Sequence, residues 1–364
     1  MPRLFTVGLS TDNITYTALT NVQEVSINIG RQRQLDAYNA TRATITLRYP
    51  NGYATPVANL VSGTFVQIQT GPSNTFVMNG IIDNVDVQYG IPFADNVGNA
   101  DFVSFTVEGS FAKFGRVQGD NYSLPAGTLT TQIADCATQT GLSIIVDQGT
   151  AQMAATTIDD TWGQWLQKVL VTINGRMWDG LNQQVTIRTP IQDYVLPYSF
   201  SDTTNNATNQ VYDQINFGSY ADNYYTQVTV TPESFSAATV QSGVAPFRTL
   251  QTNTLNASTS QATDFANYLL NNYNEKSFAL LSISCMAEAQ TSFAMDYKLT
   301  SLPGISTQVT FRGTTFNCII EGVSVTATPE SSRYTFYLSG ADLNSYLILD
   351  NAVFGRLDYN KLGF

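Results

Sequence analysis

An internal repeat constrains the fold of this chain more than any other feature of its sequence. The pattern Ile-Ile-acid-x-Val-x-Val occurs at residues 81–87 and again at 319–325. Each copy follows a Thr-Phe pair and an alternating apolar strand, and each leads into an aromatic-rich strand, at 102–107 and 334–338. Because self-similarity decides the architecture before any short motif does, we expect two related β-domains. The alternative is that two hairpins of an ordinary β-protein share this alternation by chance.

The sequence around the repeats favours β-structure as well. Apolar and polar residues alternate over much of the first 110 residues, as at Val25, Ile27 and Ile29, with Asn-Gly and Gly-Pro pairs between the runs. Thr, Asn, Gln and Ser are plentiful, aromatic residues reach 12%, and charged residues are also only 12%. This composition suits strands more than helices.

The region between the two repeats has a different pattern. A helix is expected after Thr128, which can act as its N-cap, and Gly141 can close it. A short strand at 142–146 then leads to a second helix, which Asp160 can cap. A hairpin is expected within 175–187. The apolar face of the second helix is expected to contain Trp162, Trp165, Leu166 and Val169.

These patterns divide the chain into four regions. We expect a first β-domain at 1–114, a small α/β domain at 115–198, and a second β-domain at 199–345 that contains one helix at about 261–273. Residues 346–364 alternate Leu, Ile, Val and Phe with turn residues, and are too few to bury them. We expect this last region to be a docking arm that a neighbouring surface covers. The fold class is therefore mainly β with a small α/β insert, flanked by two related β-domains.

The charge balance argues against a protein whose main work is to bind nucleic acid. The chain contains 17 Lys and Arg against 28 Asp and Glu, which gives a formal net charge of −11. Tight phosphate binding requires a basic surface. Stable DNA or RNA binding is therefore not expected.

Catalysis is not expected either. The chain has no histidine, which removes the commonest general base and the commonest metal ligand. Cys136, Cys285 and Cys318 are widely separated, so they indicate buried thiols in a reducing compartment rather than a metal site or a disulfide framework. The acidic pair Asp159-Asp160 is better explained as a helix cap than as a catalytic pair. We predict a protein that is not an enzyme and needs no cofactor or metal.

Three other classes receive weak support: sugar-binding, membrane-inserted and secreted proteins. Aromatic side chains can stack on sugars, but Trp162 and Trp165 have the helical spacing of core residues. No stretch of about 18 apolar residues is present, so we expect no membrane insertion. The amino terminus has no basic region followed by an apolar run, so secretion is not expected.

Three parts of the sequence resemble minor tail proteins of long-tailed, siphovirus-type bacteriophages. The first is a strand at 25–29 followed by the turn Gly-Arg-Gln-Arg-Gln-Leu-Asp at 30–36, and the second is the tryptophan helix followed by 175–180. The third and most specific is the ending, in which Ile-Leu-Asp, Gly-Arg-Leu-Asp and Leu-Gly-Phe follow one another within 346–364. The chain departs from the family in having Gln34 where relatives often carry Glu, and Arg356 in place of a small apolar residue.

The resemblance implies a relation to the hub proteins of the phage baseplate or tail tip. In such proteins, two tail-tube-like domains of the β-barrel or sandwich type form a ring at the distal end of the tail. A homotrimer would then present six similar surfaces to the tail tube. The implied partners are tail tube or distal tail proteins on one face and central tip or fibre proteins on the other. DNA would pass through the ring without stable binding, and the protein would be located in the virion tail after assembly in the bacterial cytoplasm.

Interface residues can be proposed from the same resemblance. The two arginines of the turn either lie on a solvated strand face or make a subunit contact, and both readings stay open. The candidates are Arg31, Arg33, Leu349, Asp350, Phe354, Leu357, Asp358, Leu362 and Phe364. The alternative function is a tail adhesin that binds carbohydrates on the host surface, and a tail-associated glycan hydrolase is a weaker third.

Overall fold

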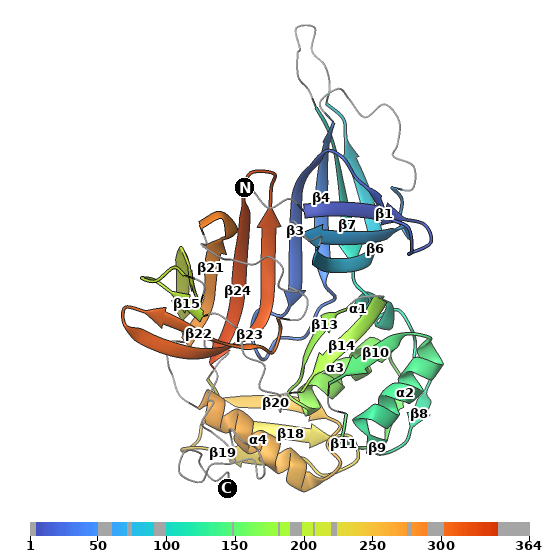
Figure 1. Ribbon diagram of the computed structural model, residues 1–364. Coiled ribbons are helices and arrows are strands. Elements are labelled where there is room, and N and C mark those ends of the chain that lie inside the picture. Colours follow the sequence, from blue (N-terminus) through green and yellow to red (C-terminus); the bar gives the residue numbers. More distant parts are fainter. Residues whose placement is uncertain are drawn as a thin grey trace.

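Strands dominate the computed structural model of the chain (Figure 1). The structure describes residues 5–49, 60–70, 75–90, 100–147, 149–180, 183–189, 199–206, 208–219, 224–274, 279–289 and 302–340.

The first part of the chain forms an antiparallel run of strands in the order β3-β4-β7-β6-β5, which β1 and β2 extend beyond β5. The alternation in the sequence explains which face is buried, because Val25, Ile27 and Ile29 all point into the core. The strands are β1 (Phe5–Ser10), β2 (Thr17–Ala18), β3 (Val22–Gly30), β4 (Arg42–Tyr49), β5 (Phe65–Thr70), β6 (Thr75–Gln88) and β7 (Asp101–Glu108).

The last part of the chain repeats this strand order as β17-β21-β24-β23-β22, again with every neighbouring pair antiparallel. Two short strands, β15 and β16, extend it beyond β22 with parallel pairing. The strands are β15 (Ser199–Ser201), β16 (Asn209–Val211), β17 (Gln214–Gly218), β21 (Ala279–Met286), β22 (Ser306–Phe311), β23 (Thr314–Ala327) and β24 (Ser332–Gly340). A 3-10 turn, η3 (Ala287–Ala289), follows β21.

The repeat seen in the sequence lies at the same place in both halves of this sheet. Its two copies are the long strands β6 and β23, and each contains a β-bulge. The register skips Asp83 where β6 pairs with β7, and it skips Glu321 where β23 pairs with β24. A shared strand order and a shared bulge position support duplication over chance similarity of two hairpins.

Within the residues that the structure describes, the two halves do not form the separate closed barrels that the barrel form of our expectation implied. Among the described residues they join edge to edge, because β3 of the first half pairs with β23 of the second. The result is one open 14-stranded sheet. To close into a barrel, each half would have to pair its own two edge strands with each other. Here β3, an edge strand of the first half, pairs instead with β23 of the second half.

A small α/β unit lies between the halves in the sequence. The expected caps are found for its first helix, where the Thr128 hydroxyl accepts from the Thr131 amide and Gly141 is left-handed with a φ of 67°. The cap of the second helix is Thr161 rather than Asp160, whose carboxylate instead accepts from the Thr161 amide. The elements are α1 (Phe111–Phe114), β8 (Tyr122–Leu124), β9 (Gly127–Thr128), α2 (Leu129–Thr140), β10 (Ser143–Val146), β11 (Gln152–Met153), β12 (Thr156–Ile158), α3 (Trp162–Thr172), β13 (Arg176–Asp179) and β14 (Gln184–Arg188).

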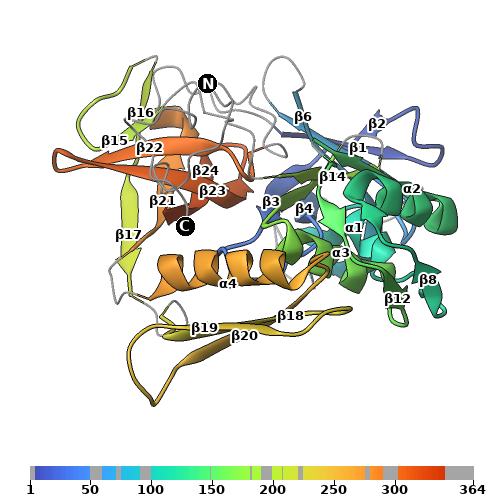
Figure 2. The ribbon, with the colours of Figure 1, turned by 90° about the horizontal axis from the view of Figure 1, so that it is seen from below.

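Residues 227–273, which we expected to belong to the second β-domain, form a separate layer. Three strands form a small sheet in the order β19-β18-β20, and one helix packs on it (Figure 2). Ala262, Leu269 and Tyr273 lie on the buried face of that helix, as their spacing predicted. The elements are β18 (Gln227–Pro232), β19 (Ala238–Gln241), β20 (Thr249–Thr254) and α4 (Thr259–Tyr273).

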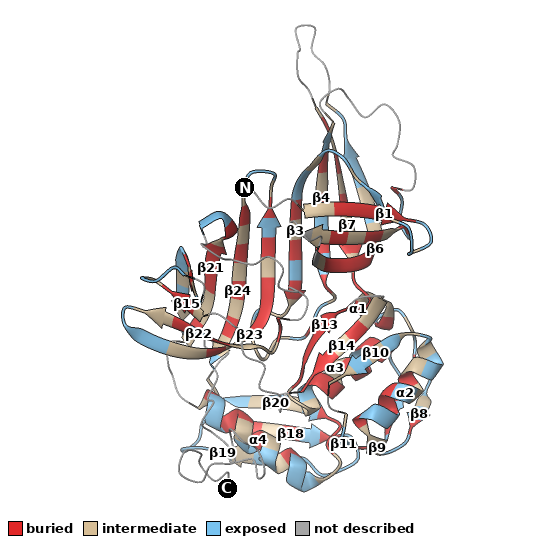
Figure 3. Ribbon diagram, viewed as in Figure 1, coloured by how far each residue is buried: buried red, intermediate tan, exposed pale blue. Residues whose placement is uncertain are grey.

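Buried residues gather into three hydrophobic clusters, one for each of these layers (Figure 3). The largest cluster is continuous across the 14-stranded sheet, so the two halves share one core. The α/β unit and the α4 layer have clusters of their own. None of the described helices is long and apolar enough to cross a membrane.

Candidate assembly site where the two halves of the sheet meet

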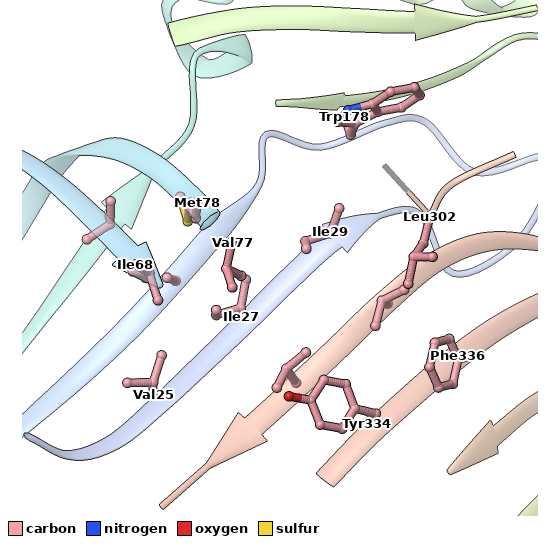
Figure 4. Packing of buried hydrophobic residues seen from close by; sticks show 14 of the residues in the cluster. Val25, Ile27, Ile29, Ile68, Val77, Met78, Trp178, Leu302, Tyr334 and Phe336 are labelled. Carbon is pink, nitrogen blue, oxygen red and sulfur yellow. The ribbon is translucent and has the colours of Figure 1, made fainter. Parts of the chain in front are cut away.

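The pairing of β3 with β23 holds the two halves together. It is antiparallel and runs from Gly30 opposite Gly322 to Val25 opposite Ala327. Side chains from both strands enter the shared core, as Figure 4 shows for Ile27 beside the strands of the second half. Backbone pairing of the two strands and burial of their apolar side chains therefore both hold the two halves together.

Two glycines make the closest approach at this seam possible. Gly30 is left-handed with a φ of +78°, and a Cβ built there would lie 2.4 Å from the Glu321 carbonyl oxygen. A Cβ on Gly322 would lie 2.4 Å from the Arg31 carbonyl oxygen and 2.5 Å from that of Ile29. Both contacts are with backbone, which cannot move aside as a flexible side chain can. Any side chain at position 322 would therefore push the two strands apart.

A buried ion triad closes the end of the seam. The Arg31 Nε and one Glu321 oxygen are 2.8 Å apart, and the Arg176 Nη2 lies 2.8 Å from the other oxygen. The side chains of Arg31, Arg176 and Glu321 are 8%, 3% and 0% exposed. The Ser339 hydroxyl donates a further bond of 2.6 Å to Glu321. A carboxylate in this position stays charged only because its partners are in place.

The pKa values at the triad follow from this balance. Burial by itself would raise the pKa of Glu321, but Arg176, Arg31 and the Ser339 hydroxyl outweigh it and lower the pKa to about 2. Burial would lower the pKa of Arg176, yet the facing Glu321 holds it above its ordinary value. Glu321 and Arg176 therefore remain charged at neutral pH.

The triad also joins layers that the sequence separates widely. Arg31 follows β3, Arg176 begins β13 of the α/β unit, and Glu321 sits at the bulge of β23. The guanidinium of Arg31 lies 4.5 Å from the ring centroid of Tyr38, a cation–π contact. Burial raises the pKa of Tyr38 to about 12, so its ring stays neutral beside the ions.

The turn after β3 reaches the α4 layer as well. The Gln34 amide donates to the Tyr268 hydroxyl at 3.1 Å, and its oxygen accepts from the Tyr273 hydroxyl at 2.7 Å. Both tyrosines belong to α4. The turn at 30–36 is thus the point where all three layers touch one another.

A second buried carboxylate ties the first half to the α/β unit. Asp179, at the end of β13, accepts from the Thr41 amide at 2.7 Å and the Phe111 amide at 2.6 Å. Burial raises the pKa of Asp179, and these backbone donors act in the opposite direction. A Cβ on Gly109 would lie 2.4 Å from the carboxyl carbon, so this joint also depends on a glycine.

The structure separates the two arginines proposed as interface residues. Arg31 is buried in the triad, so its contact joins two parts of one chain. Arg33 is half exposed, and its guanidinium lies 2.9 Å from Asp36 of the same turn. The other candidates lie outside the described residues: Leu349, Asp350, Phe354, Leu357, Asp358, Leu362 and Phe364.

Sequence reasoning missed Glu321, Arg176 and Ser339 as members of this site. One signal was present, because Glu321 is the acid of the repeated pattern and Asp83 is its counterpart. Asp83 makes a more exposed ion pair with Arg116 at 3.2 Å. The identity of the partners depends on the fold and could not be read from spacing.

Neither a metal-binding group nor an exposed thiol is present among the residues that the structure describes. No group of His, Cys, Asp and Glu among them could hold a metal ion. The three cysteines are buried and unpaired, and burial raises the pKa of Cys136 and Cys318 to about 12. Trp162 and Trp165 are buried core residues, as predicted, so neither offers a face to a sugar.

Comparison with known proteins gives a likeness in fold alone. The sequence matches no family profile and no curated protein. The structure is similar to a 43 kDa tail protein of prophage MuSo2 from Shewanella oneidensis, at 12% identity and a TM-score of 0.67, over 93% of this chain and 98% of that one. A tail protein from Neisseria meningitidis MC58 is similar at 11% identity and a TM-score of 0.66, over 94% and 97%.

A third similar structure is that of a secretion-system protein. The Escherichia coli c3393 protein, described as a component of the type VI secretion system, is similar at 9% identity and a TM-score of 0.58. That likeness covers 92% of this chain and 77% of the other. The chain therefore has the fold of phage tail proteins, which confirms the resemblance seen in its sequence at the level of fold.

Proposed function

We propose that this chain is a structural component of a bacteriophage tail, a hub protein at the distal end that adapts the tail tube to tip or fibre proteins. The observation that carries the proposal is the likeness over nearly the whole chain to two tail proteins, one of them from a prophage, each covered almost completely. The duplicated strand order within one sheet supports the more specific hub role. A virion component of this kind would be assembled in the cytoplasm of the bacterial host.

The duplication fits a ring of three copies. A protein that caps a six-subunit tube must present six similar surfaces, and a chain with two related halves does so as a trimer. The β3–β23 seam would then be one of six similar contacts around the ring. The buried triad would hold each pair of halves at a fixed angle, so that three copies close.

The proposed channel lets DNA pass without holding it. A wall of Lys and Arg would retain phosphates through counterion release, and this chain has a net charge of −11. We propose no catalytic step. The burial of the tryptophans supports a role in assembly over one in which their rings stack on sugars.

Electron microscopy of virions labelled with an antibody against this chain tests the proposal. We expect label at the distal end of the tail, and quantitative mass spectrometry should give three copies for each ring of six tube subunits. Label on the capsid, or no chain in purified virions, would overturn the tail role. Six copies for each ring would overturn the trimer while leaving the tail role intact.

A further inference from the structure

The 14-stranded sheet has several open strand edges within the described part of the chain, and two of them are related through the repeat. One is the carboxy-terminal half of β6, where residues 84–88 pair with β7 alone. The other is β17, which pairs with β21 alone and lies at the far margin of the second half (Figure 2). An exposed strand edge presents unpaired backbone donors and acceptors, which proteins generally cover or protect.

The repeat shows what covers each edge in the other half. β6 corresponds to β23, and the matching segment of β23 is covered by β3. β17 corresponds to β3, since both are the first strand of the shared order. The strand that would cover β6 in the same manner is therefore a copy of β17, and the strand that would cover β17 is a copy of β6.

Burial at matched positions supports this relation. In β23, Val325 and Ala327 are 0% and 2% exposed where the strand pairs with β3. Their counterparts Val87 and Tyr89 are 37% and 62% exposed. The apolar pattern is the same in both copies, but among the described strands only the β23 copy has a neighbour, β3, that buries it.

We propose that β17 of one copy of this chain pairs antiparallel with the carboxy-terminal half of β6 in the next copy, reproducing the β3–β23 seam between molecules. This inference rests on the proposed ring and names its contact. Transfer of the β3–β23 register places Val87 opposite Phe217, Gln88 opposite Asn216 and Tyr89 opposite Ile215. Such a contact is head-to-tail, the kind that builds rings when its rotation closes.

The chemistry of the two edges is compatible with this pairing. Ile215 and Phe217 lie on the core-facing side of β17 and are only partly buried, so they can complete the cover over Val87 and Tyr89. β17 carries no charge, and it therefore places no like charge opposite Asp86. Asn84 stands where β23 has Gly322, so the closest approach cannot be copied and the pairing is expected to begin at Val85.

Disulfide trapping in assembled tails tests the pairing. Gln88→Cys and Asn216→Cys are combined in one chain, since both side chains are exposed and directly opposed strands bring Cα atoms within about 4.5–5.5 Å, inside the range for a disulfide. Tails are isolated under reducing conditions and then oxidised with diamide. The native cysteines are buried and do not compete.

The expected result is covalently linked chains on non-reducing gels, with a ladder that stops at three. A matched control combines Gln88→Cys with Gln241→Cys, and it should give no links, because Gln241 is also exposed but lies on β19 of the small sheet. Each single variant should likewise remain unlinked.

The outcomes separate the contact from the function. Tails that contain the double variant yet give no linked chains would overturn the strand pairing and leave the tail role standing. Linked chains of purified protein with none found in virions would support the pairing and overturn the tail role. A ladder that continues beyond three would support the pairing and contradict the three-copy ring.

Discussion

The two halves of the sheet place the same motif in opposite situations. At the bulge of β23, Glu321 is fully buried between Arg31 and Arg176. At the bulge of β6, Asp83 pairs at 3.2 Å with Arg116, whose side chain is 66% exposed. The acid of the repeat is buried in the β23 copy, whereas in the β6 copy it is partly exposed to solvent. The difference teaches that a duplicated element can serve once as an internal joint and once as an external edge.

The largest difference between the copies should appear on removal of the acid. Glu321→Ala leaves two buried guanidinium groups unpaired, and we expect a loss of about 3–5 kcal/mol in the free energy of unfolding. Asp83→Ala removes an exposed partner and should cost about 0–1 kcal/mol. Chemical denaturation of both variants measures the contrast. Equal losses at the two positions would show that the buried triad contributes no more to stability than the exposed ion pair of Asp83 does.

The same triad should make stability depend on acid. The pKa of Glu321 is lowered from 4.5 to about 2 on folding, so its stabilisation is complete above pH 4.5 and is lost as the pH falls toward 2. A shift of this size corresponds to something on the order of 3 kcal/mol. Denaturation of the native chain and of Glu321→Gln between pH 7 and pH 2 is the measurement.

Another buried carboxyl acts in the opposite direction over part of that range. The pKa of Asp179 is raised, so its contribution is present at low pH and is lost as the pH rises through the raised value. The difference between the native chain and Glu321→Gln cancels this background. A difference that stays constant with pH would contradict the assignment of the acid sensitivity to Glu321.

The seam itself should respond to its glycine. Gly322→Ala places a Cβ 2.4 Å from a backbone oxygen, and overpacking of this kind costs about 1–3 kcal/mol. Gly340→Ala is the matched control, because a Cβ there meets nothing within 4 Å. We expect Gly322→Ala to lower the Tm and Gly340→Ala to leave it unchanged, as measured by thermal unfolding. If both variants have the Tm of the unsubstituted chain, the close approach of β3 and β23 does not contribute to stability.

The sequence predicted much of the local structure and little of the seam. The repeat, the helices with their apolar faces, and the hairpin at 175–187 depend on short-range patterns, and the structure contains them. The contact of Arg31 with Glu321 spans 290 residues, and Arg176 comes from a different unit. No local pattern records such a meeting, because a strand edge looks the same in sequence whichever strand covers it. The separate sheet of β18–β20 was missed for the same reason.

Val87→Lys tests the exposed copy of the repeat in β6. We expect it to have the smallest effect on folding and a large effect on assembly. Val87→Lys places a charge on the open edge of β6, where the side chain is already 37% exposed, so the free energy of unfolding should change by about 0.5 kcal/mol or less. A lysine on a strand edge opposes pairing with another strand, because pairing would bury the charge against Phe217 of the next copy. We expect the chain to remain folded but to enter tails poorly, as counted by mass spectrometry of purified particles.

Val61→Lys provides the control, since Val61 is 59% exposed and belongs to neither open edge. If Val87→Lys enters tails as well as the control does, the edge of β6 is not an assembly surface, and the likeness between the inner and outer seams ends at the fold of a single chain.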